Sequence, residues 1–568
     1  ESPQARPPGS QNMPIDIDDL RKDRGGDPDK VRTSEKRRFA DLQIVDRVIE
    51  LDTIWREMRG SNDRLRRDKG ALGKQIGALM KAGKREEANK LKASMKEKNK
   101  EYDAKIKEQE RKATEAEKER DELLHKIGNF VHDSVPIGDD EDKFNKIERT
   151  WGLDNKRGHG SNDVKANPGG GKEGALLHHH ELLTRIDGYE PERGVRVAGH
   201  RAYFLKGAGV ALNFALQTYA QAFLAKQGYT LLQVPYFMNK DNMGKVAELD
   251  DYDDTLYHVN TGTPTEDKYL IATSEQPICL YHANEWINEK KIKEKPLFYG
   301  GVSTCFRKEA GKTGVDNWGI FRVHQFEKIE QFCVCHPEDS WKMHEKMIAQ
   351  SEAFTKSLGL PYQVINICSG ELNNAAAKKY DLEAWFPGYV DIDKEKGHPH
   401  PGMRELVSCS NCLDYQSRAV SIRCGDPKKK ADGSKAKKVY VHMLNATLCA
   451  TTRVICCILE NNQTPEGVLI PEVLLPFMNP SFVKEDSKGR KHIPYTREAP
   501  PPPEEPKKKK KGGKKGGAGG GKGGAPKKES KSNDTKKGLT KKLEAWAKDG
   551  ALSKAEYEIV SKALASQQ

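Results

Sequence analysis

Residues 304–330 constrain the fold of this chain more than any other stretch, because they predict two strands joined by a polar loop. Phe306 opens the first strand, and Val323, Phe326 and Ile329 belong to an apolar strand that follows the turn-rich segment 310–319. Two such runs around a Gly-containing loop are typical of a β-hairpin. The chain is therefore expected to contain antiparallel strands.

Charged and polar side chains flank this hairpin. Alternation along a strand places Arg307 and Glu309 on one face of the first strand, and Gln325 and Glu327 on one face of the second. Arginine can bind a phosphate through two parallel hydrogen bonds. A nearby carboxylate can bind a purine amino group or orient the arginine, and Phe326 can stack on a flat base. The alternative is an exposed hairpin with ordinary surface charges.

A P-loop is excluded in the same segment. Gly311, Lys312 and Thr313 match the end of that motif, but Phe306 stands where it needs glycine. Residues 315–319 also do not begin a helix, which the motif requires. The hairpin interpretation is therefore retained.

Several stretches resemble the signature motifs of class II aminoacyl-tRNA synthetases. Phe306-Arg-Lys-Glu309 followed by Gly319-Ile-Phe-Arg-Val-His-Gln-Phe326 resembles the second motif, and the wording Arg-Val-His-Gln-Phe resembles the seryl branch. The resemblance implies an α+β fold, in which an antiparallel catalytic sheet is flanked by helices. It also implies an N-terminal helical-hairpin arm, to which this chain adds a C-terminal extension.

Composition points to a protein of a reducing compartment. The chain has 568 residues, a formal net charge of +13 and eleven cysteines. The excess of positive charge suggests a polyanionic partner, and the adjacent pair Cys456 and Cys457 does not fit a disulfide framework. No apolar run reaches transmembrane length, and the N-terminus has no secretory signal pattern. We expect a cytoplasmic protein that does not associate with membranes.

Residues 38–128 predict two long helices. Apolar residues such as Leu42, Val45 and Ile49 recur at helical spacing in a stretch rich in Lys, Glu, Arg and Ala, with an interruption at 81–84. Two helices of about 40 residues around a short turn make an antiparallel hairpin roughly 60 Å long.

Basic side chains crowd the end of this hairpin. A solvated coiled-coil surface could carry such charges, but they could also bind phosphates. Seryl-tRNA synthetases have such an arm, which binds the long variable arm of tRNA(Ser). The resemblance therefore implies tRNA binding by Arg64, Arg66, Arg67, Lys69, Lys74, Lys81, Lys84 and Arg85.

Residues 210–227 predict a helix that stops at Gly228, followed by a strand at 229–234 and then Pro235. This order resembles the first class II motif, which forms the dimer interface in the family. The resemblance therefore implies a homodimer. The alternative is a plain helix–strand unit within a core.

A Thr-x-Glu sequence at 273–275 matches a loop of the seryl group. A hydroxyl and a carboxylate close together suit the ammonium and hydroxyl of an amino acid, although the tripeptide alone is commonplace. The resemblance implies that L-serine is bound by Thr273, Glu275, Arg307, Glu330, Asn445 and Thr447.

Two metal interpretations compete at one strand. Cys409 and Cys412 have the spacing of half a zinc site, but Cys424 stands alone downstream, so a second pair is missing. The resemblance instead implies that Glu405 and Ser408 bind the Mg²⁺ that accompanies ATP, in keeping with the preference of Mg²⁺ for oxygen ligands. We expect no structural zinc.

Residues 441–460 predict a strand, a turn of small residues and an apolar helix that contains Arg453. This order resembles the third class II motif and implies that Arg453 meets the γ-phosphate, that Phe326 stacks on adenine and that Glu309 reads its amino group. The implied catalytic residues are Arg307, Arg453 and Glu330. The implied ATP-binding residues are Arg307, Lys308, Glu309, Val323, His324, Gln325, Phe326, Glu405, Leu406, Val407, Ser408 and Arg453.

Composition changes predict a division of the chain into five parts. These are an extension at 1–12, a tRNA-binding domain at 13–140 with its arm at about 38–128, a catalytic domain at 141–495, a Pro- then Lys/Gly-rich linker at 496–535 and a small helical hairpin at 536–568.

The predicted reaction is ATP-dependent conversion of L-serine to seryl-adenylate, followed by transfer of serine to the 3′ end of tRNA(Ser), with tRNA(Sec) as a further candidate. Three alternatives stay open: a class II synthetase for another amino acid, a non-catalytic paralogue that binds RNA, and a coiled-coil scaffold that needs no ATP. The arginines of the second and third motifs are present, which favours an enzyme.

Overall fold

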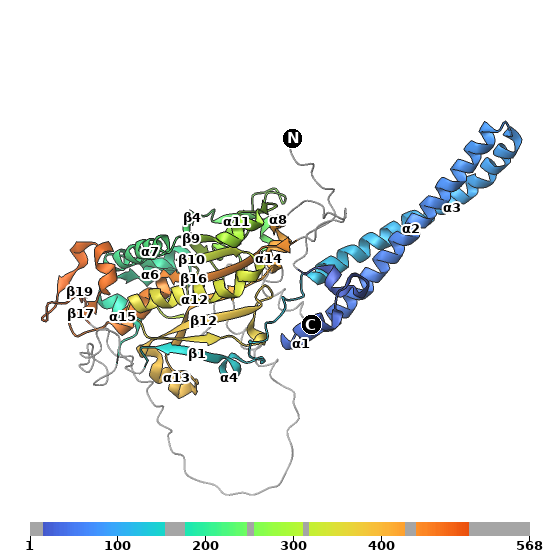
Figure 1. Ribbon diagram of the computed structural model, residues 1–568. Coiled ribbons are helices and arrows are strands. Elements are labelled where there is room, and N and C mark those ends of the chain that lie inside the picture. Colours follow the sequence, from blue (N-terminus) through green and yellow to red (C-terminus); the bar gives the residue numbers. More distant parts are fainter. Residues whose placement is uncertain (1–14, 154–175, 247–254, 310–316, 426–438, 499–568) are drawn as a thin grey trace, which may run out of the picture. The chain divides into compact units, whose positions relative to one another are not determined.

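An eight-stranded sheet organises the computed structural model, which describes residues 15–153, 176–246, 255–309, 317–425 and 439–498 (Figure 1). Neighbouring strands are antiparallel except for one parallel pair at the edge, β9 with β4. In sheet order the strands are β1 (Lys146–Trp151), β11 (Tyr362–Asn366), β12 (Lys378–Trp385), β13 (Met403–Asn411), β16 (His442–Ala450), β10 (Gln325–Cys335), β9 (Leu297–Phe306) and β4 (Thr230–Gln233). The predicted antiparallel fold is confirmed.

The longer helices α7 (Ala208–Lys226), α12 (Ser340–Ser357) and α15 (Thr451–Asn461) pack against this sheet. Successive side chains of a strand point to opposite faces. In β16, Leu444, Ala446 and Leu448 therefore enter the main hydrophobic core, whereas Asn445 and Thr447 point to the opposite face. That opposite face carries the polar residues described below.

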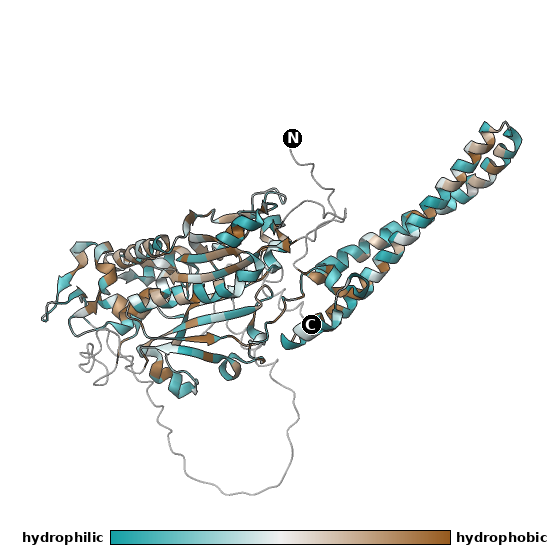
Figure 2. Ribbon diagram, in the orientation of Figure 1, coloured by the Kyte–Doolittle hydropathy of each residue, from teal (hydrophilic) through white to brown (hydrophobic). Residues whose placement is uncertain are grey.

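The predicted arm is confirmed as two long helices. η1 (Ile17–Leu20), η2 (Lys22–Arg24) and α1 (Pro28–Arg37) precede α2 (Gln43–Lys81) and α3 (Arg85–Leu124), which pack together as a hairpin. Gly83, with φ of 74°, makes the left-handed turn between them. Figure 2 shows scattered hydrophobic positions along mostly hydrophilic helices, as expected for a thin seam.

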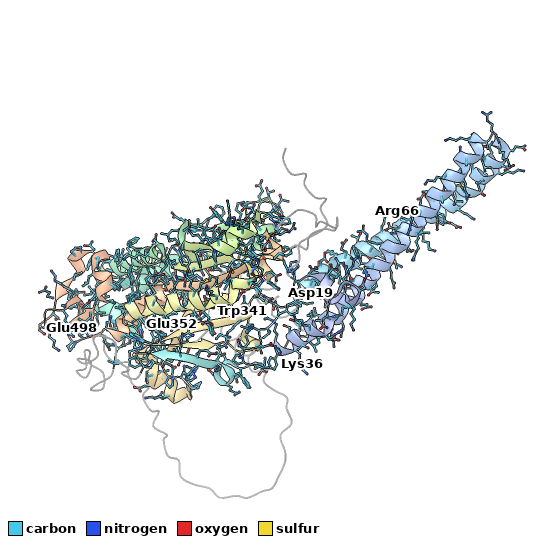
Figure 3. All side chains as sticks on the ribbon, in the orientation of Figure 1. Asp19, Lys36, Arg66, Trp341, Glu352 and Glu498 are labelled. Atoms are coloured by element: carbon cyan, nitrogen blue, oxygen red, sulfur yellow. The ribbon has the colours of Figure 1, made fainter. Side chains whose placement is uncertain are left out.

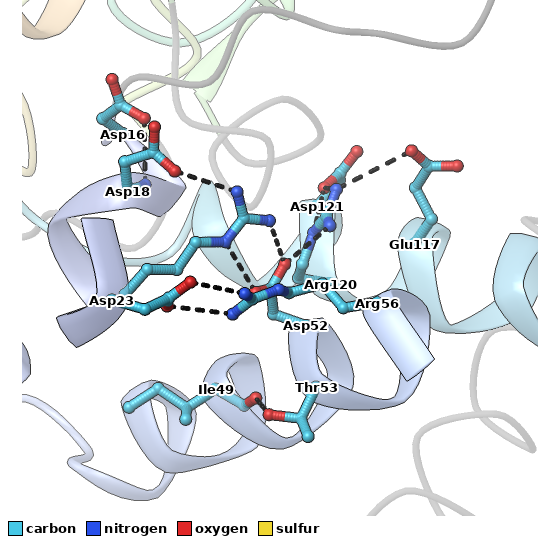
Figure 4. Close-up of polar contacts among 11 residues, drawn as sticks. Asp16, Asp18, Asp23, Ile49, Asp52, Thr53, Arg56, Glu117, Arg120 and Asp121 are labelled. Carbon is cyan, nitrogen blue, oxygen red and sulfur yellow. Dashed lines mark hydrogen bonds and ion pairs between the residues drawn. The ribbon is translucent and has the colours of Figure 1, made fainter. Parts of the chain in front are cut away.

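A buried ion cluster joins the two arm helices near their base (Figure 4). The carboxylate of Asp52 accepts hydrogen bonds from Arg21 at 2.6 and 2.8 Å and from Arg120 at 3.1 Å. Arg120 also binds Asp121 at 2.7 Å, and its Cζ lies 5.0 Å from the centre of the Trp55 ring. A buried carboxylate requires such counter-charges, so this cluster holds α2, α3 and the preceding turn in one arrangement.

Short elements complete the described chain. The helices are α4 (Glu141–Phe144), α5 (His179–Arg185), α6 (Pro191–Ala198), α8 (Lys240–Met243), α10 (Glu275–Cys279), α11 (Glu289–Glu294), α13 (Val390–Lys396), α14 (Tyr415–Ala419), η5 (Pro337–Asp339), η6 (Ser369–Glu371), η7 (Pro387–Tyr389), η8 (Glu472–Phe477) and η9 (Pro480–Phe482). The strands are β2 (Tyr189–Glu190), β3 (Phe204–Leu205), β5 (Phe237–Asn239), β6 (His258–Val259), β7 (Lys268–Leu270), β8 (Trp286–Ile287), β14 (Arg423–Cys424), β15 (Val439–Tyr440), β17 (Gly467–Leu469), β18 (Lys484–Glu485) and β19 (Lys491–Pro494).

Nearly all of the predicted linker and the whole predicted C-terminal hairpin fall at 499–568, outside the described residues. The same holds for the predicted extension at 1–12. Within the ranges given above, the structure contains no helix long and apolar enough to cross a membrane.

Candidate functional site

Arg307 lies at the end of the central hairpin, beside an aromatic ring. The expectation that Phe306 opens the first strand is wrong, because the pairing of β9 with β10 extends back to Leu297. β9 ends at Phe306 and β10 begins at Gln325, so Arg307 directly follows the first strand. Its Cζ is 5.3 Å from the centre of the Phe326 ring, and its Nε donates to the carbonyl oxygen of Ala272 at 3.3 Å. The guanidinium is therefore oriented while other N–H groups are left for a phosphate or carboxylate.

Glu309, two residues further on, is held by two other arginines. Arg322 Nη1 lies 2.8 Å from Glu309 Oε2, and Arg201 Nη1 donates to the Glu309 carbonyl oxygen at 3.0 Å. Glu309 has φ of 50°, in a region that residues other than glycine seldom occupy. The arginines thus stabilise an unusual turn. The role of Glu309 as a reader of the adenine amino group stays a prediction, as do the roles of the half-buried Lys308 and the exposed Gln325.

Four residues predicted to bind ATP have buried side chains, and Phe326 is one of them. Val323, Leu406 and Val407 all belong to the hydrophobic core, so only their backbone atoms could meet a nucleotide. His324 uses one ring nitrogen inside the hairpin, where Nδ1 lies 2.9 Å from the carbonyl oxygen of Arg307.

A buried carboxylate, Glu330, lies at the centre of a polar pocket on the same face of the sheet. Lys328 Nζ lies 2.5 Å from Glu330 Oε1. Its other oxygen accepts hydrogen bonds from the Thr273 hydroxyl at 2.6 Å, the Ser274 hydroxyl, and the backbone N–H of Glu275 at 3.2 Å. Burial alone would raise the pKa of Glu330, but Lys328 and these donors hold that pKa below its usual range. The pocket therefore contains a fixed negative charge.

A second carboxyl group, Glu275, differs in its surroundings. Its Oε1 accepts hydrogen bonds from Gln416 Nε2 at 2.5 Å and from Asn445 Nδ2 at 2.9 Å. Both donors are neutral. Burial, reinforced by the nearby charge of Glu330, raises the pKa of Glu275 to about 7. The pKa values of the two carboxyl groups of the pocket are thus shifted in opposite directions.

The third motif brings two more predicted residues to this region. Thr447 lies opposite Glu330 in the pairing of β16 with β10. Arg453, on α15, donates from Nη1 to the Glu405 carbonyl oxygen at 2.9 Å and to Glu405 Oε2 at 3.2 Å. The Arg453 Cζ also lies 4.8 Å from the centre of the Phe321 ring, an arrangement that parallels Arg307 over Phe326.

Oxygen donors gather where β12 pairs with β13. Asp381 lies opposite Ser408 and Glu383 lies opposite Glu405 in the strand register. Asp381 Oδ1 is buried without a hydrogen-bond partner among the described residues. Burial raises the pKa of Asp381 to about 7, despite the nearby Lys379. An unpartnered carboxylate oxygen beside a carboxylate and a hydroxyl suits a hard cation such as Mg²⁺.

The other metal interpretations gain no support. Cys409 Sγ approaches the carbonyl oxygen of His344 at 3.9 Å, and Cys412 Sγ accepts from Asn445 at 3.6 Å. In the described ranges, no group of three His, Cys, Asp or Glu side chains converges as metal ligands. Magnesium accompanying ATP needs fewer protein ligands, because it retains water and phosphate oxygens.

Comparison with known proteins decides the family. Residues 15–131 match the seryl-tRNA synthetase N-terminal domain, and residues 257–462 match the class II tRNA synthetase core domain (G, H, P, S and T). The chain is 49% identical over 488 residues to the cytoplasmic serine–tRNA ligase of Dictyostelium discoideum, covering 86% of this chain and 96% of that protein. This chain belongs to the seryl-tRNA synthetase family.

Solved structures of seryl-tRNA synthetases have the same fold. The cytoplasmic serine–tRNA ligase of Naegleria fowleri, determined in complex with AMP, has a TM-score of 0.69 and 44% identity, covering 86% of this chain and 100% of that one. The seryl-tRNA synthetase of Pyrococcus horikoshii, complexed with ATP, has a TM-score of 0.69 and 36% identity, covering 84% and 99%. The N-terminal arm and the class II sheet are therefore family features.

The arm carries two kinds of basic side chain. Arg66, Lys69 and Lys84 pair with acidic neighbours on α3: Glu110, Asp103 at 2.5 Å and Glu87 at 3.2 Å, respectively. Figure 3 labels Arg66 on the hairpin. The other five of the eight basic residues predicted to bind tRNA make no ion pair with a described residue: Arg64, Arg67, Lys74, Lys81 and Arg85. The second group is available to a polyanion without breaking an ion pair.

Sequence reasoning missed several residues of the synthetase site. Lys328, Ser274 and Gln416 contact predicted pocket residues, and Asp381 lies beside the predicted metal ligands. Lys328 carried a usable signal, because alternation in a strand places it on the same face as Glu330. Gln416 carried none, since it meets Glu275 from 141 positions away.

Proposed function

We propose that this chain catalyses the two-step attachment of L-serine to tRNA(Ser), with tRNA(Sec) as a second acceptor. In the first step the serine carboxylate attacks the α-phosphorus of ATP, so that seryl-adenylate forms and pyrophosphate leaves. In the second step a hydroxyl at the tRNA 3′ end attacks the seryl carbonyl, and AMP leaves. The observation that carries the proposal is the pocket around Glu330, a fixed carboxylate that Thr273 contacts, next to Ala272, whose carbonyl oxygen accepts the Arg307 hydrogen bond.

Serine selectivity follows from the polarity of this pocket. The ionised Glu330 can accept hydrogen bonds from the serine ammonium and hydroxyl, and Thr273, Asn445 and Thr447 surround the same position. Alanine lacks the hydroxyl and would leave buried polar groups unpaired, which disfavours its binding. Glu275 completes the proposed serine-binding group through its hydrogen bond with Asn445.

ATP is proposed to bind along the hairpin and the third motif. Arg307 and Arg453 would stabilise the charge that develops on the phosphates, and Phe326 would stack on adenine. The serine carboxylate is already a nucleophile, so the first step needs no general base from the protein. The remaining nucleotide contacts are proposed for Lys308, Glu309, Val323, His324, Gln325, Leu406 and Val407.

Magnesium is proposed to accompany ATP at the β12–β13 pair. Glu405 and Ser408 would hold it, and the buried Asp381 Oδ1 fits the same cation. When bound, Mg²⁺ would neutralise phosphate charge. The Arg453 contact to Glu405 places a protein cation beside the same carboxylate. Mg²⁺ and Arg453 would therefore both neutralise the negative charge of the phosphates.

Transfer RNA is proposed to bind the arm through its phosphates, and the protein is proposed to work as a cytoplasmic homodimer. Two large exposed apolar side chains support a dimer interface: Phe214 on the first-motif helix α7 is 61% exposed, and Val197 on the preceding helix α6 is 74% exposed. We also propose the division into a tRNA-binding domain at 13–140 and a catalytic domain at 141–495.

ATP–pyrophosphate exchange across a panel of amino acids tests this function. We expect exchange with serine and charging of tRNA(Ser) by the same preparation. Exchange driven by another amino acid would assign a different class II specificity. Absence of exchange with every amino acid, together with retained RNA binding, would instead favour a non-catalytic paralogue.

A further inference from the structure

Glu275 is placed to orient another pocket residue. Its Oε1 accepts the Asn445 Nδ2 hydrogen bond at 2.9 Å, and the Cys412 sulfur accepts from the same nitrogen at 3.6 Å. Because Glu275 Oε1 and Cys412 Sγ are both acceptors, the NH₂ end of the Asn445 amide faces them. The NH₂ group is committed to Glu275 and Cys412, so the amide oxygen is the end left to meet a ligand.

Gln416 in turn holds Glu275 from outside the pocket. It lies on α14, is only 3% exposed, and donates from Nε2 to Glu275 Oε1 at 2.5 Å. Its own amide oxygen is buried without a hydrogen-bond partner among the described residues. The unpaired oxygen destabilises this buried amide. The hydrogen bond from the Gln416 nitrogen to Glu275 is therefore the contact that keeps the side chain in this position.

We propose that Gln416 and Glu275 form a positioning relay that turns the Asn445 amide oxygen toward the serine hydroxyl, and that Glu275 acts through Asn445 rather than on the serine ammonium. An amide oxygen accepts a hydrogen bond from a hydroxyl but is left unpaired by a methyl group. The relay therefore sets the preference for serine over alanine. This inference rests on the proposed function, because it needs a serine-binding pocket.

The relay does not depend on the charge of Glu275. A carboxyl group protonated on Oε2 still accepts two hydrogen bonds at Oε1. Besides Glu330 itself, the charged or titratable groups close to this carboxyl or to Glu330 are Lys328, Cys279, Cys305 and Cys412. None of them donates a hydrogen bond to Glu275 in the described structure, so neutral amides alone control its Oε1.

Two non-hydrolysable adenylate analogues, seryl- and alanyl-sulfamoyl adenosine, separate the possible roles of Glu275. The two analogues share the ammonium and differ only in the hydroxyl. Binding of the seryl analogue should weaken by about tenfold, the size of one hydrogen bond, in Gln416→Met, Gln416→Leu and Glu275→Leu. Binding of the alanyl analogue should be nearly unchanged in the same variants. Glu275→Gln keeps an acceptor oxygen and should restore the preference for the seryl analogue.

Two comparisons complete the experiment. Gln416→Met should have no additional effect in an Asn445→Ala background, because the relay acts through that amide. Ser417→Ala, which alters the same short helix through a hydroxyl that bonds to Asp414 and Val441, should leave the preference intact. A loss of preference in Ser417→Ala would overturn the relay, since general disturbance of α14 would then explain the Gln416 variants.

The outcomes distinguish this inference from the function on which it rests. If the Glu275 and Gln416 variants bind both analogues more weakly by the same factor, Glu275 contacts the shared ammonium and the relay is wrong. A seryl preference that survives in both Gln416 variants also overturns it. If the unmodified protein itself binds the two analogues equally, the proposed serine specificity fails, whatever the variants do.

Discussion

The environment of single charged residues controls the proposed chemistry. Arg307 and Arg453 each lie over an aromatic ring at 5.3 and 4.8 Å, and Glu330 is buried against Lys328. Rings and buried counter-charges restrict the positions of these side chains before a ligand binds. Preorganised charges of this kind account for much of the rate enhancement in phosphoryl and acyl transfer.

Arg307→Ala should lower kcat/KM in ATP–pyrophosphate exchange on the order of a thousandfold, because it removes a charge that stabilises the transition state. Steady-state exchange kinetics with serine measure this loss. Arg37→Ala, which removes a surface ion pair with Asp133, is a matched control and should change little. A loss below about tenfold for Arg307→Ala would remove this arginine from the proposed mechanism.

Lys328→Met should shift the acidic limb of the serine-dependent pH profile to higher pH. Lys328 lowers the pKa of Glu330, so its loss raises that pKa and the ionised carboxylate forms only at higher pH. The stability that the lowered pKa contributes is present above the ordinary pKa of a glutamate and is lost as pH falls through the native value.

Lys328→Arg retains the cation and should keep the original profile. The variants are compared by kcat/KM for serine across the pH range, with melting temperature as a check on folding, since an unpaired buried charge costs about 3–5 kcal/mol. An unshifted acidic limb in a folded Lys328→Met protein would show that Glu330 does not control serine binding.

At the scale of elements, the arm separates its basic side chains by their ion pairs. Arg64, Lys74, Lys81 and Arg85 belong to the group that makes no ion pair within the described residues, whereas Arg66 is paired with Glu110. A paired side chain must give up one partner to bind another, so the unpaired set is better placed to bind phosphates.

Changing Arg64, Lys74, Lys81 and Arg85 to glutamine should weaken tRNA binding and lower the salt dependence of the binding constant, by about one unit of log–log slope for each phosphate that the arm no longer neutralises. Binding titrations with tRNA(Ser) at several salt concentrations measure both quantities. Serine-dependent pyrophosphate exchange without tRNA should stay unchanged. As a comparison, Arg66 and Lys69 are both changed to glutamine. If this double variant loses as much tRNA affinity per changed residue as the fourfold variant, the distinction between paired and unpaired side chains is wrong.

At the scale of the whole molecule, the arm and the catalytic sheet are proposed to act together across a dimer. The family resemblance implies that the arm of one subunit delivers tRNA to the active site of the other. The structure refines where the arm can be shortened. Gln109 Nε2 donates to the Ser61 hydroxyl at 3.2 Å, so removing 62–108 and adding a short glycine-containing turn closes the hairpin at neighbouring positions.

A mixed dimer of one arm-shortened subunit and one Arg307→Ala subunit should charge tRNA, although each homodimer should not. The armed but inactive subunit would bind tRNA, and the shortened subunit would supply the active site. Aminoacylation by a purified heterodimer with two affinity tags measures this. The shortened homodimer should retain pyrophosphate exchange as a control. A heterodimer that exchanges pyrophosphate without charging tRNA would mean that each subunit serves its own tRNA.

The sequence determined features that depend on neighbours along the chain. Helical spacing predicted the two arm helices, and the helix expected at 210–227 is α7, Ala208–Lys226. The two apolar runs around the polar loop at 304–330 predicted the hairpin of β9 and β10, although β9 ends at Phe306 instead of beginning there. The motif resemblance also named residues that the fold brings together, including Thr273, Glu330 and Asn445.

Only the tertiary structure decided the contacts around those residues. β16 pairs between β13 and β10, so its neighbours come from distant parts of the chain. Gln416 reaches Glu275, and Arg120 reaches Asp52 across the arm hairpin. Periodicity reports which face of an element is buried, but not which element covers it. The partners of a buried polar group are therefore set by sheet order and helix packing, whereas local spacing sets only the elements that carry them.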